Sequence, residues 1–201
     1  MSTLETHAVF VRRGKLLEYL TIAYNSLEGV IAVGAGIVAG SVALVGFGFD
    51  SAIEVFASLL LVWRLHAGEK AEKRALQLVG VSFLVLAAYV AFDATKSLIG
   101  RDAPDESIVG IALAALSVVV MPLLVHAKRN VARAINSRAM LAEAKQTQLC
   151  MYLSVILLAG LGLNAALGWW WADPVAALVM VPIIGNEGRE ALRGEECSCH
   201  T

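Results

Sequence analysis

The hydrophobic positions of the chain fall into six long runs, and short polar segments separate them. The runs are Leu16–Gly40, Ser41–Leu65, Ala75–Leu98, Ile108–Val125, Met140–Leu167 and Pro174–Gly185. A helix needs roughly 20 residues to cross a hydrocarbon core of about 30 Å, and most of the runs are long enough. The last run reaches this length only if its helix continues through Glu187 to Ala191. The pattern predicts six transmembrane helices.

The segment "GWWWADP" separates the fifth run from the sixth. Asp173 and Pro174 predict the N-cap and the first residue of the sixth helix, since aspartate and proline favour these two positions. Tryptophan prefers the membrane–water interface, so we expect "GWWWAD" at the outer interface.

The composition agrees with a membrane protein: 58% of the 201 residues are hydrophobic and 16% are charged. Soluble domains average about half apolar and a quarter charged. The start, "MSTLETHAVFVRRGK", lacks the apolar core of a signal peptide. The chain has no basic tract interleaved with aromatic residues, so we do not expect it to bind nucleic acid. We therefore expect an all-α polytopic membrane protein without a soluble domain: an N-terminal segment (1–15), a six-helix transmembrane domain (16–193) and a short tail (194–201).

Lysine and arginine are concentrated on one side of the predicted spans. The opposite side carries only Lys96 and Arg101, and Lys145 lies in or near the fifth span. By the positive-inside rule, both termini are cytoplasmic. The basic residues of the cytoplasmic segments are Arg12, Arg13, Lys15, Arg64, Lys70, Lys73, Arg74, Lys128, Arg129, Arg133, Arg138, Arg189 and Arg193.

Asp50 and Glu54 lie one helical turn apart within the second apolar run. A carboxylate in the membrane interior costs about 2.5–3.5 kcal/mol on insertion scales, and two on one helix face also repel each other. Protonation, a bound cation or a hydrogen bond from a protonated acid to a neighbouring helix offsets this cost. We favour a cation or proton site for the pair.

Other runs offer further donors. Glu143, Gln146 and Cys150 share one face of the fifth run, and Asn25 and Glu28 are three residues apart in the first. Oxygen donors together with a thiolate suit Zn²⁺ or Cd²⁺ better than Mg²⁺ or Ca²⁺. Because a glutamine ligand is unusual, Gln146 either orients a ligand or binds weakly. Cys150 is either a metal ligand or a small core residue.

The segment "GSVALVGFGFDSAIEVFASLLLVWRL" resembles the second transmembrane helix of the cation diffusion facilitators, whose acidic pair is matched by Asp50 and Glu54. In the fifth helix, that family carries an "AD…HxxxD" pattern. Here "AEAKQTQLC" takes its place, so the resemblance matches Glu143 to the upstream acid, Gln146 to the histidine and Cys150 to the second aspartate. "GWWWADPVAAL" is similar to the family's approach to its sixth helix. The resemblance extends over residues 16–193.

The resemblance implies a homodimeric metal transporter of a bacterial inner (plasma) membrane, here without the cytoplasmic metal-binding domain that many relatives carry. We expect proton-coupled export of divalent cations by alternating access. Metal ligation requires deprotonated groups, so metal ions and protons would compete for one site. No cofactor is expected to be permanently bound, because Zn²⁺ or Cd²⁺ is the cargo. Lipid and protons are the other expected partners.

Several secondary features have two interpretations each. His66 is a solvated interfacial residue or part of a peripheral metal site. Asp93 forms a local ion pair with Lys96 or takes part in an external pathway. The small residues Gly36 and Gly40 predict close helix packing. The tail residues Cys197, Cys199 and His200 either capture a soft metal or have no function.

Two other functions compete with transport. A membrane sensor or accessory subunit would bind metal without translocating it. An intramembrane enzyme is the weaker alternative, because the sequence contains neither HExxH nor GxSxG and has no Ser–His pair within the predicted spans. We therefore do not expect an enzyme.

Overall fold

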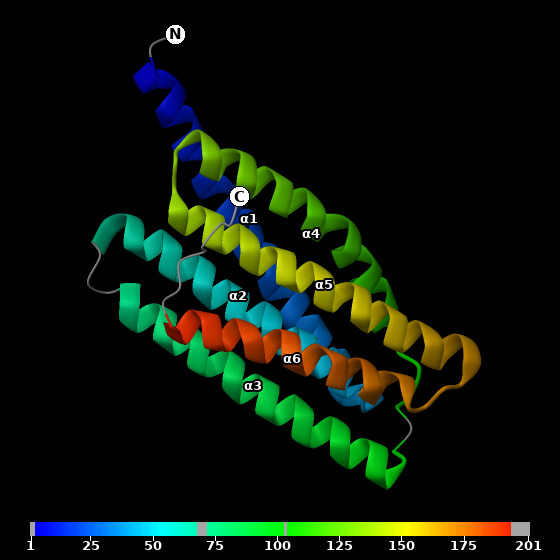
Figure 1. Ribbon diagram of the computed structural model, residues 1–201. Coiled ribbons are helices and arrows are strands. Elements are labelled where there is room, and N and C mark those ends of the chain that lie inside the picture. The colour runs from blue at the N-terminus through cyan, green and yellow to red at the C-terminus, as the bar shows by residue number, and fades with distance from the viewer. Residues whose placement is uncertain (1–2, 68–71, 103, 194–201) are drawn as a thin grey trace.

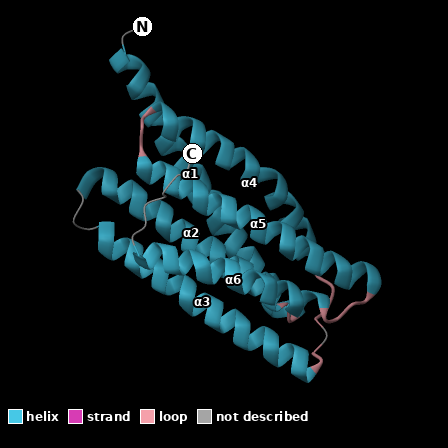
Figure 2. Ribbon diagram, viewed as in Figure 1, coloured by secondary structure: helices cyan, strands magenta, loops and turns pink. Residues whose placement is uncertain are grey.

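The computed structural model describes residues 3–67, 72–102 and 104–193. In this part of the chain every regular element is a helix (Figures 1 and 2). Five of the helices are long and apolar enough to cross a membrane, so the predicted all-α polytopic class is confirmed. The helices are α1 (Thr3–Ala39), α2 (Val42–Ala67), α3 (Glu72–Gly100), α4 (Ile108–Ala134), α5 (Arg138–Leu167) and α6 (Ala172–Arg193).

Three helices, α1, α4 and α6, extend furthest beyond the apolar runs that predicted them. Helix α1 already begins at Thr3, so most of the N-terminal segment (1–15) continues the first span. Helix α4 runs past Val125 to Ala134, and α6 reaches Arg193. The added residues are rich in arginine, lysine, glutamate and alanine, which propagate a helix outside an apolar environment.

Helices α1, α2, α4 and α5 form a bundle, and α3 and α6 pair beside it (Figure 1). Within the bundle, α1 packs on α2, α2 on α5, α5 on α4 and α4 on α1, which closes the ring. The outer pair contacts this ring through α2 and α5. The four helices of the ring therefore enclose a common interior.

Glycines permit the closest helix contacts. A Cβ at Gly36 of α1 would lie 2.8 Å from the backbone nitrogen of Val45, so the predicted close packing holds there. Gly40 behaves differently: it has a φ of +66° in the turn after α1, and no atom lies within 4 Å of its Cβ position. Its role is the left-handed backbone of the turn, which other residues adopt at a cost.

Helices α3 and α6 meet at a reciprocal glycine contact. A Cβ at Gly80 would lie 2.8 Å from the carbonyl oxygen of Gly188, and one at Gly188 would lie 2.9 Å from that of Gly80. Each glycine thus leaves room for the backbone of the other helix.

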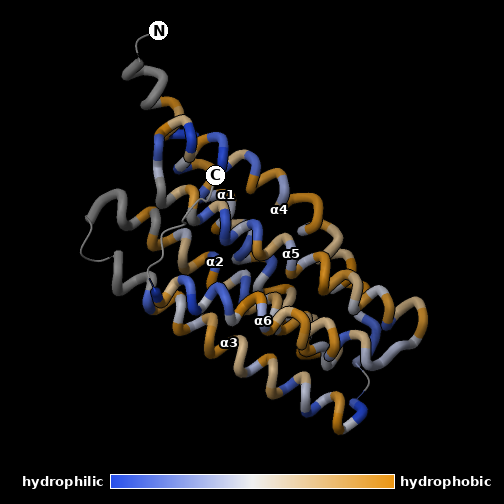
Figure 3. The backbone as a smooth tube through the Cα atoms, in the orientation of Figure 1, coloured by the Kyte–Doolittle hydropathy of each residue, from blue (hydrophilic) through white to orange (hydrophobic). Residues whose placement is uncertain are grey.

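The bundle is apolar outside and partly polar inside. Val30 and Val38 of α1 are 75% and 84% exposed, whereas Asn25 and Glu28 of the same helix are buried. Figure 3 shows hydrophobic residues along most of α3 and α4, with hydrophilic residues near helix ends. This arrangement suits a chain whose outer surface faces lipid.

The prediction that Asp173 caps the sixth helix was wrong. Helix α6 begins one residue earlier, at Ala172, and Asp173 lies in its first turn. Its carboxylate instead accepts hydrogen bonds from the Ser41 hydroxyl (2.5 Å) and from the Ala43 backbone N–H (3.4 Å), at the start of α2. Asp173 therefore satisfies free donors of a neighbouring helix, a pairing that local sequence does not reveal.

Candidate metal site inside the helix bundle

Each helix of the ring turns polar side chains toward the interior. On α1, α2 and α5 these residues recur every three or four positions, so each set forms a stripe along one helix face. The buried polar residues of this interior are Glu18, Thr21, Asn25 and Glu28 on α1; Asp50, Ser51, Glu54 and Ser58 on α2; Ser117 and Lys128 on α4; and Glu143, Thr147, Cys150 and Ser154 on α5. Asn164 of α5 is also buried, but it bonds to the Pro104 carbonyl in the connection before α4.

Glu28 joins the four helices of the ring at one level. Its carboxylate accepts hydrogen bonds from Ser51 of α2 (2.9 Å) and from Ser117 of α4. Ser117 also pairs with the hydroxyl of Tyr24 at 2.9 Å. The Cys150 sulfur of α5 lies 4.0 Å from Glu28 Oε2. Helix packing thus brings together a carboxylate of α1 and a thiol of α5, which are far apart along the chain.

Asp50 and Glu54 are 4% and 1% exposed and face the same interior. Glu54 Oε1 accepts a hydrogen bond from the Thr147 hydroxyl at 2.7 Å, whereas Glu54 Oε2 has no hydrogen-bond partner among the described residues. The Cys150 thiol of α5 is buried as well and lies 4.0 Å from Glu28 Oε2. Asp50, Glu54, Glu28 and Cys150 therefore surround one region between α1, α2 and α5.

These side chains do not yet form a ligand set. Within the described ranges, no three His, Cys, Asp or Glu side chains are grouped closely enough to hold a metal ion. Zn²⁺ needs its oxygen and sulfur ligands at about 2.0–2.3 Å. Binding would thus require the side chains to move together around the ion.

Asn25 and Gln146 contribute unpartnered polar atoms. Both side-chain polar atoms of Asn25 are buried without a hydrogen-bond partner, and so is Gln146 Nε2. Such atoms are rare in folded proteins and need an explanation, for example a ligand. Gln146 itself is only half-buried, because it lies beside the inward stripe of α5 rather than within it.

Thr147, which was not predicted to be a site residue, faces the interior of the ring in place of Gln146. It is fully buried and bonds to Glu54, and it lies four residues after Glu143 and three before Cys150. Those two spacings place it on the same helix face. Its periodicity was therefore the signal that could have identified it.

Lys128 is the largest departure from the expected arrangement. The sequence placed it in a cytoplasmic connection, but it lies within α4 and is 0% exposed. Its ammonium is 3.3 Å from Glu143 Oε1, 3.5 Å from Glu18 Oε2 and 3.1 Å from the Thr147 hydroxyl. Glu143 also accepts a hydrogen bond from Ser58 of α2. Glu143 is thus part of an ion-pair cluster adjacent to Glu54.

A comparison with protein families identifies the domain. The model of the cation efflux transmembrane domain matches residues 19–193, which include the whole polar interior except Glu18. The chain belongs to the cation efflux family. The resemblance drawn from the second, fifth and sixth helices is thereby confirmed.

Two curated relatives of this cation efflux chain are distant. An uncharacterized transporter of Synechocystis sp. is 24% identical over 160 residues, covering 74% of this chain and 52% of the relative. The magnetosome protein MamB of Magnetospira sp. is 26% identical over 184 residues, covering 84% of this chain and 61% of the relative. The chain thus spans only about half to three fifths of these relatives.

The remaining predicted residues lie outside the interior or outside the described side chains. Asp93 of α3 is half-buried and within hydrogen-bonding reach of Tyr89, one turn earlier, while Lys96 is exposed. His66 lies in α2, but its side chain is not described. The tail residues Cys197, Cys199 and His200 also lie outside the described part of the chain.

Proposed function

We propose that this cation efflux chain exports divalent metal cations from the cytoplasm. The observation that carries the proposal is the charge of the ring interior. Lys128 is the one buried base among the described side chains, and it faces an excess of carboxyl groups that a cation would offset. The buried carboxyl groups of the ring are Glu18, Glu28, Asp50, Glu54 and Glu143.

Zn²⁺ and Cd²⁺ are the cargo that we propose. Asp50, Glu54 and Glu28 supply oxygens, and Cys150 adds a sulfur donor that favours softer ions. The free side-chain carbonyl oxygen of Asn25 supplies a further weak ligand, whereas the free atom of Gln146 is an amide nitrogen, which does not bind a cation. The metal is the transported substrate, and the proposal requires no enzymatic step and no resident cofactor.

Protons are the proposed counter-ion. Carboxylates and a thiol bind metal only when deprotonated, so protons arriving from the outer side would compete with the metal and release it. Rocking of the helices around a central site would expose it to each side in turn. We further propose a homodimer in a bacterial inner membrane with both termini cytoplasmic.

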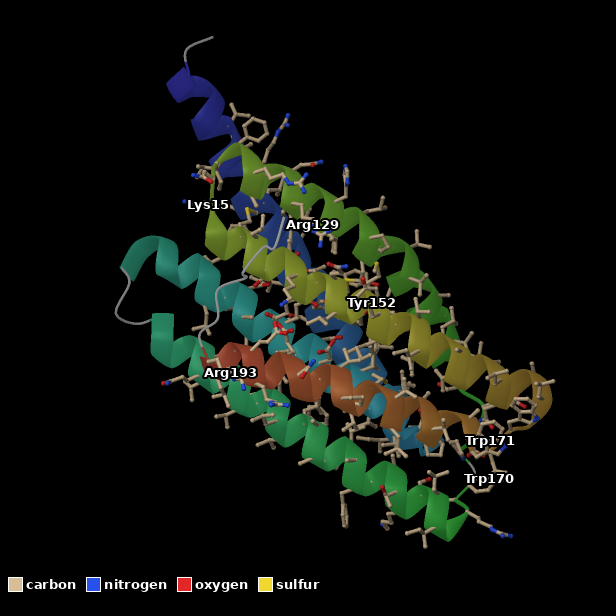
Figure 4. All side chains as sticks on the ribbon, in the orientation of Figure 1. Lys15, Arg129, Tyr152, Trp170, Trp171 and Arg193 are labelled. Carbon is tan, nitrogen blue, oxygen red and sulfur yellow. The ribbon has the colours of Figure 1, made fainter. Side chains whose placement is uncertain are left out.

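The helix ends support this orientation. Figure 4 shows Lys15 and Arg193 at one end of the bundle and Trp170 and Trp171 at the other. Basic residues favour the cytoplasmic side, and tryptophans favour an interface.

Metal flux in proteoliposomes tests the proposal. We expect Asp50→Ala to abolish Zn²⁺ and Cd²⁺ uptake while the purified protein stays folded. Asp93→Asn is the matched control, because Asp93 is a carboxylate of α3 outside the ring and should leave most of the flux intact. Equal flux in the Asp50→Ala variant and the parent would contradict the proposal.

The same assay separates transport from binding alone. A sensor or accessory subunit would bind Zn²⁺ saturably in detergent without any flux in liposomes. A panel that includes Mn²⁺ tests the ion preference, since we expect slower Mn²⁺ flux at a site with a thiol ligand.

A further inference from the structure

Lys128 lies in the interior without contact to solvent. It approaches Glu18 of α1 and Glu143 of α5, and Glu143 is hydrogen-bonded to Ser58 of α2. Since Lys128 belongs to α4, this cluster connects all four helices of the ring. Separation of the four helices at this level would have to break it.

The cluster lies between Glu54 and the basic end of the bundle. Glu18 precedes Glu28 by ten residues on α1, which corresponds to about 15 Å along the helix axis. Ser117 and Lys128 are separated by a similar length of α4, in the same direction along the bundle. A cation that entered from the proposed cytoplasmic side would meet this cluster before it met Asp50 and Glu54.

A hydrogen-bonded path joins the cluster to the candidate metal site. Lys128 Nζ donates to Thr147 Oγ1 at 3.1 Å, and the Thr147 hydroxyl donates to Glu54 Oε1 at 2.7 Å. The ammonium is therefore one side chain away from Glu54.

The carboxylate of Glu18 is buried with few polar partners. It is 2% exposed, and neither of its oxygens has a hydrogen-bond partner among the described residues. Its 3.5 Å approach to Lys128 is longer than a normal N–H···O bond. A buried ion pair that serves only stability normally has its remaining lone pairs bonded. Glu18 Oε1 instead has no partner, and Oε2 has only the long approach to Lys128, so the carboxylate could accept a cation.

We propose that Glu18 and Glu143 form a second cation site on the path to Asp50 and Glu54, and that the ammonium of Lys128 occupies this site. A metal ion that enters from the basic end displaces the ammonium and binds the two carboxylates before it moves on. Lys128 is thus a tethered competitor of the cargo. This inference rests on the proposed transport function.

Calorimetric titration of the purified full chain with Zn²⁺ tests the second site. In Lys128→Met, the freed carboxylates should bind one more ion per chain than in the parent. Adding Glu18→Gln should remove that extra ion. A folded Lys128→Met protein that binds the parental number of ions with the parental affinity would overturn the inference.

Lys128→Gln also decides the case if Lys128→Met does not fold, because its amide can still donate hydrogen bonds to the two carboxylates while the positive charge is removed. Without the tethered competitor, Zn²⁺ should associate about tenfold faster in stopped-flow mixing, a barrier change of about 1.4 kcal/mol. An unchanged association rate would overturn the inference. Neither the number of bound ions nor the association rate depends on flux. A parent chain that binds Zn²⁺ but does not transport it would therefore contradict the proposed function without deciding whether the second site exists.

Discussion

Thr147 connects two charged groups that no sequence motif links. Its hydroxyl receives a hydrogen bond from Lys128 and gives one to Glu54. Glu54 Oε1 has Thr147 as its donor, and Oε2 has none in the described chain. Among the buried residues, Thr147 is therefore the one whose polar group most directly affects both the ion-pair cluster and the candidate metal site.

Thr147→Val should lower the free energy of unfolding by about 1–3 kcal/mol, because a buried carboxylate oxygen loses its donor. Thermal unfolding in detergent measures this change. The deficit should shrink in saturating Zn²⁺ if Glu54 coordinates the ion, since the metal would replace the lost donor.

Thr21→Val is the matched control for this prediction. Thr21 is equally buried, but its hydroxyl bonds to the Leu17 carbonyl of its own helix. That carbonyl belongs to the helix ladder, so the control should cost less. A smaller loss for Thr147→Val than for Thr21→Val would contradict the role given to Thr147.

At the scale of the helices, α3 and α6 form a separate pair that carries none of the candidate ligands. The Gly80–Gly188 contact brings their backbones together. Because the pair contacts the ring through α2 and α5, it can support those two helices without contributing to the site.

Gly80→Ala should destabilise the protein by about 1–3 kcal/mol, since the new methyl group would overlap the carbonyl oxygen of Gly188 at 2.8 Å. Gly34→Ala is the control, because it adds the same methyl group to helix α1 at a position whose Cβ would have no neighbouring atom within 4 Å. This substitution should be neutral or slightly stabilising. Both effects are measured by thermal unfolding in the same detergent. Equal stabilities of the two variants would show that the α3–α6 contact tolerates the added group.

At the scale of the whole molecule, the polar interior runs along the bundle axis from the Lys128 cluster toward Glu28. Many large apolar side chains are exposed on the outside of the bundle, so this polar interior is where the described ring could accept an ion. The proposed exchange of metal for protons would use these interior groups in both directions.

A proton gradient should therefore drive metal movement. With proteoliposomes whose lumen is more acidic than the outside, we expect faster Zn²⁺ uptake by the molecules whose termini face outward, because lumenal protons displace the ion from its ligands. A protonophore that dissipates the gradient should reduce the rate to that seen without a gradient. Uptake that is indifferent to the gradient and to the protonophore would rule out proton coupling.

The sequence by itself determined the helices and much of the interior. Apolar runs predicted all six helices, because crossing lipid forces each span to satisfy its own backbone hydrogen bonds. The sixth run was the shortest, and α6 is not among the five helices of the described chain that are long and apolar enough to span a membrane. The cost of burying Asp50 and Glu54 marked them as unusual, and helical spacing placed Glu143 and Cys150 on one face of α5. These properties depend on single segments, so a linear pattern contains them.

Only the tertiary structure decided which groups meet. It placed Thr147 rather than Gln146 in the inward stripe of α5, turned Lys128 inward, and directed Asp173 to the start of α2. A polar side chain such as that of Lys128 can face water or a neighbouring helix, and the local sequence is the same in both cases. The choice depends on the carboxylates and free backbone donors that other helices bring to it, and packing alone sets these.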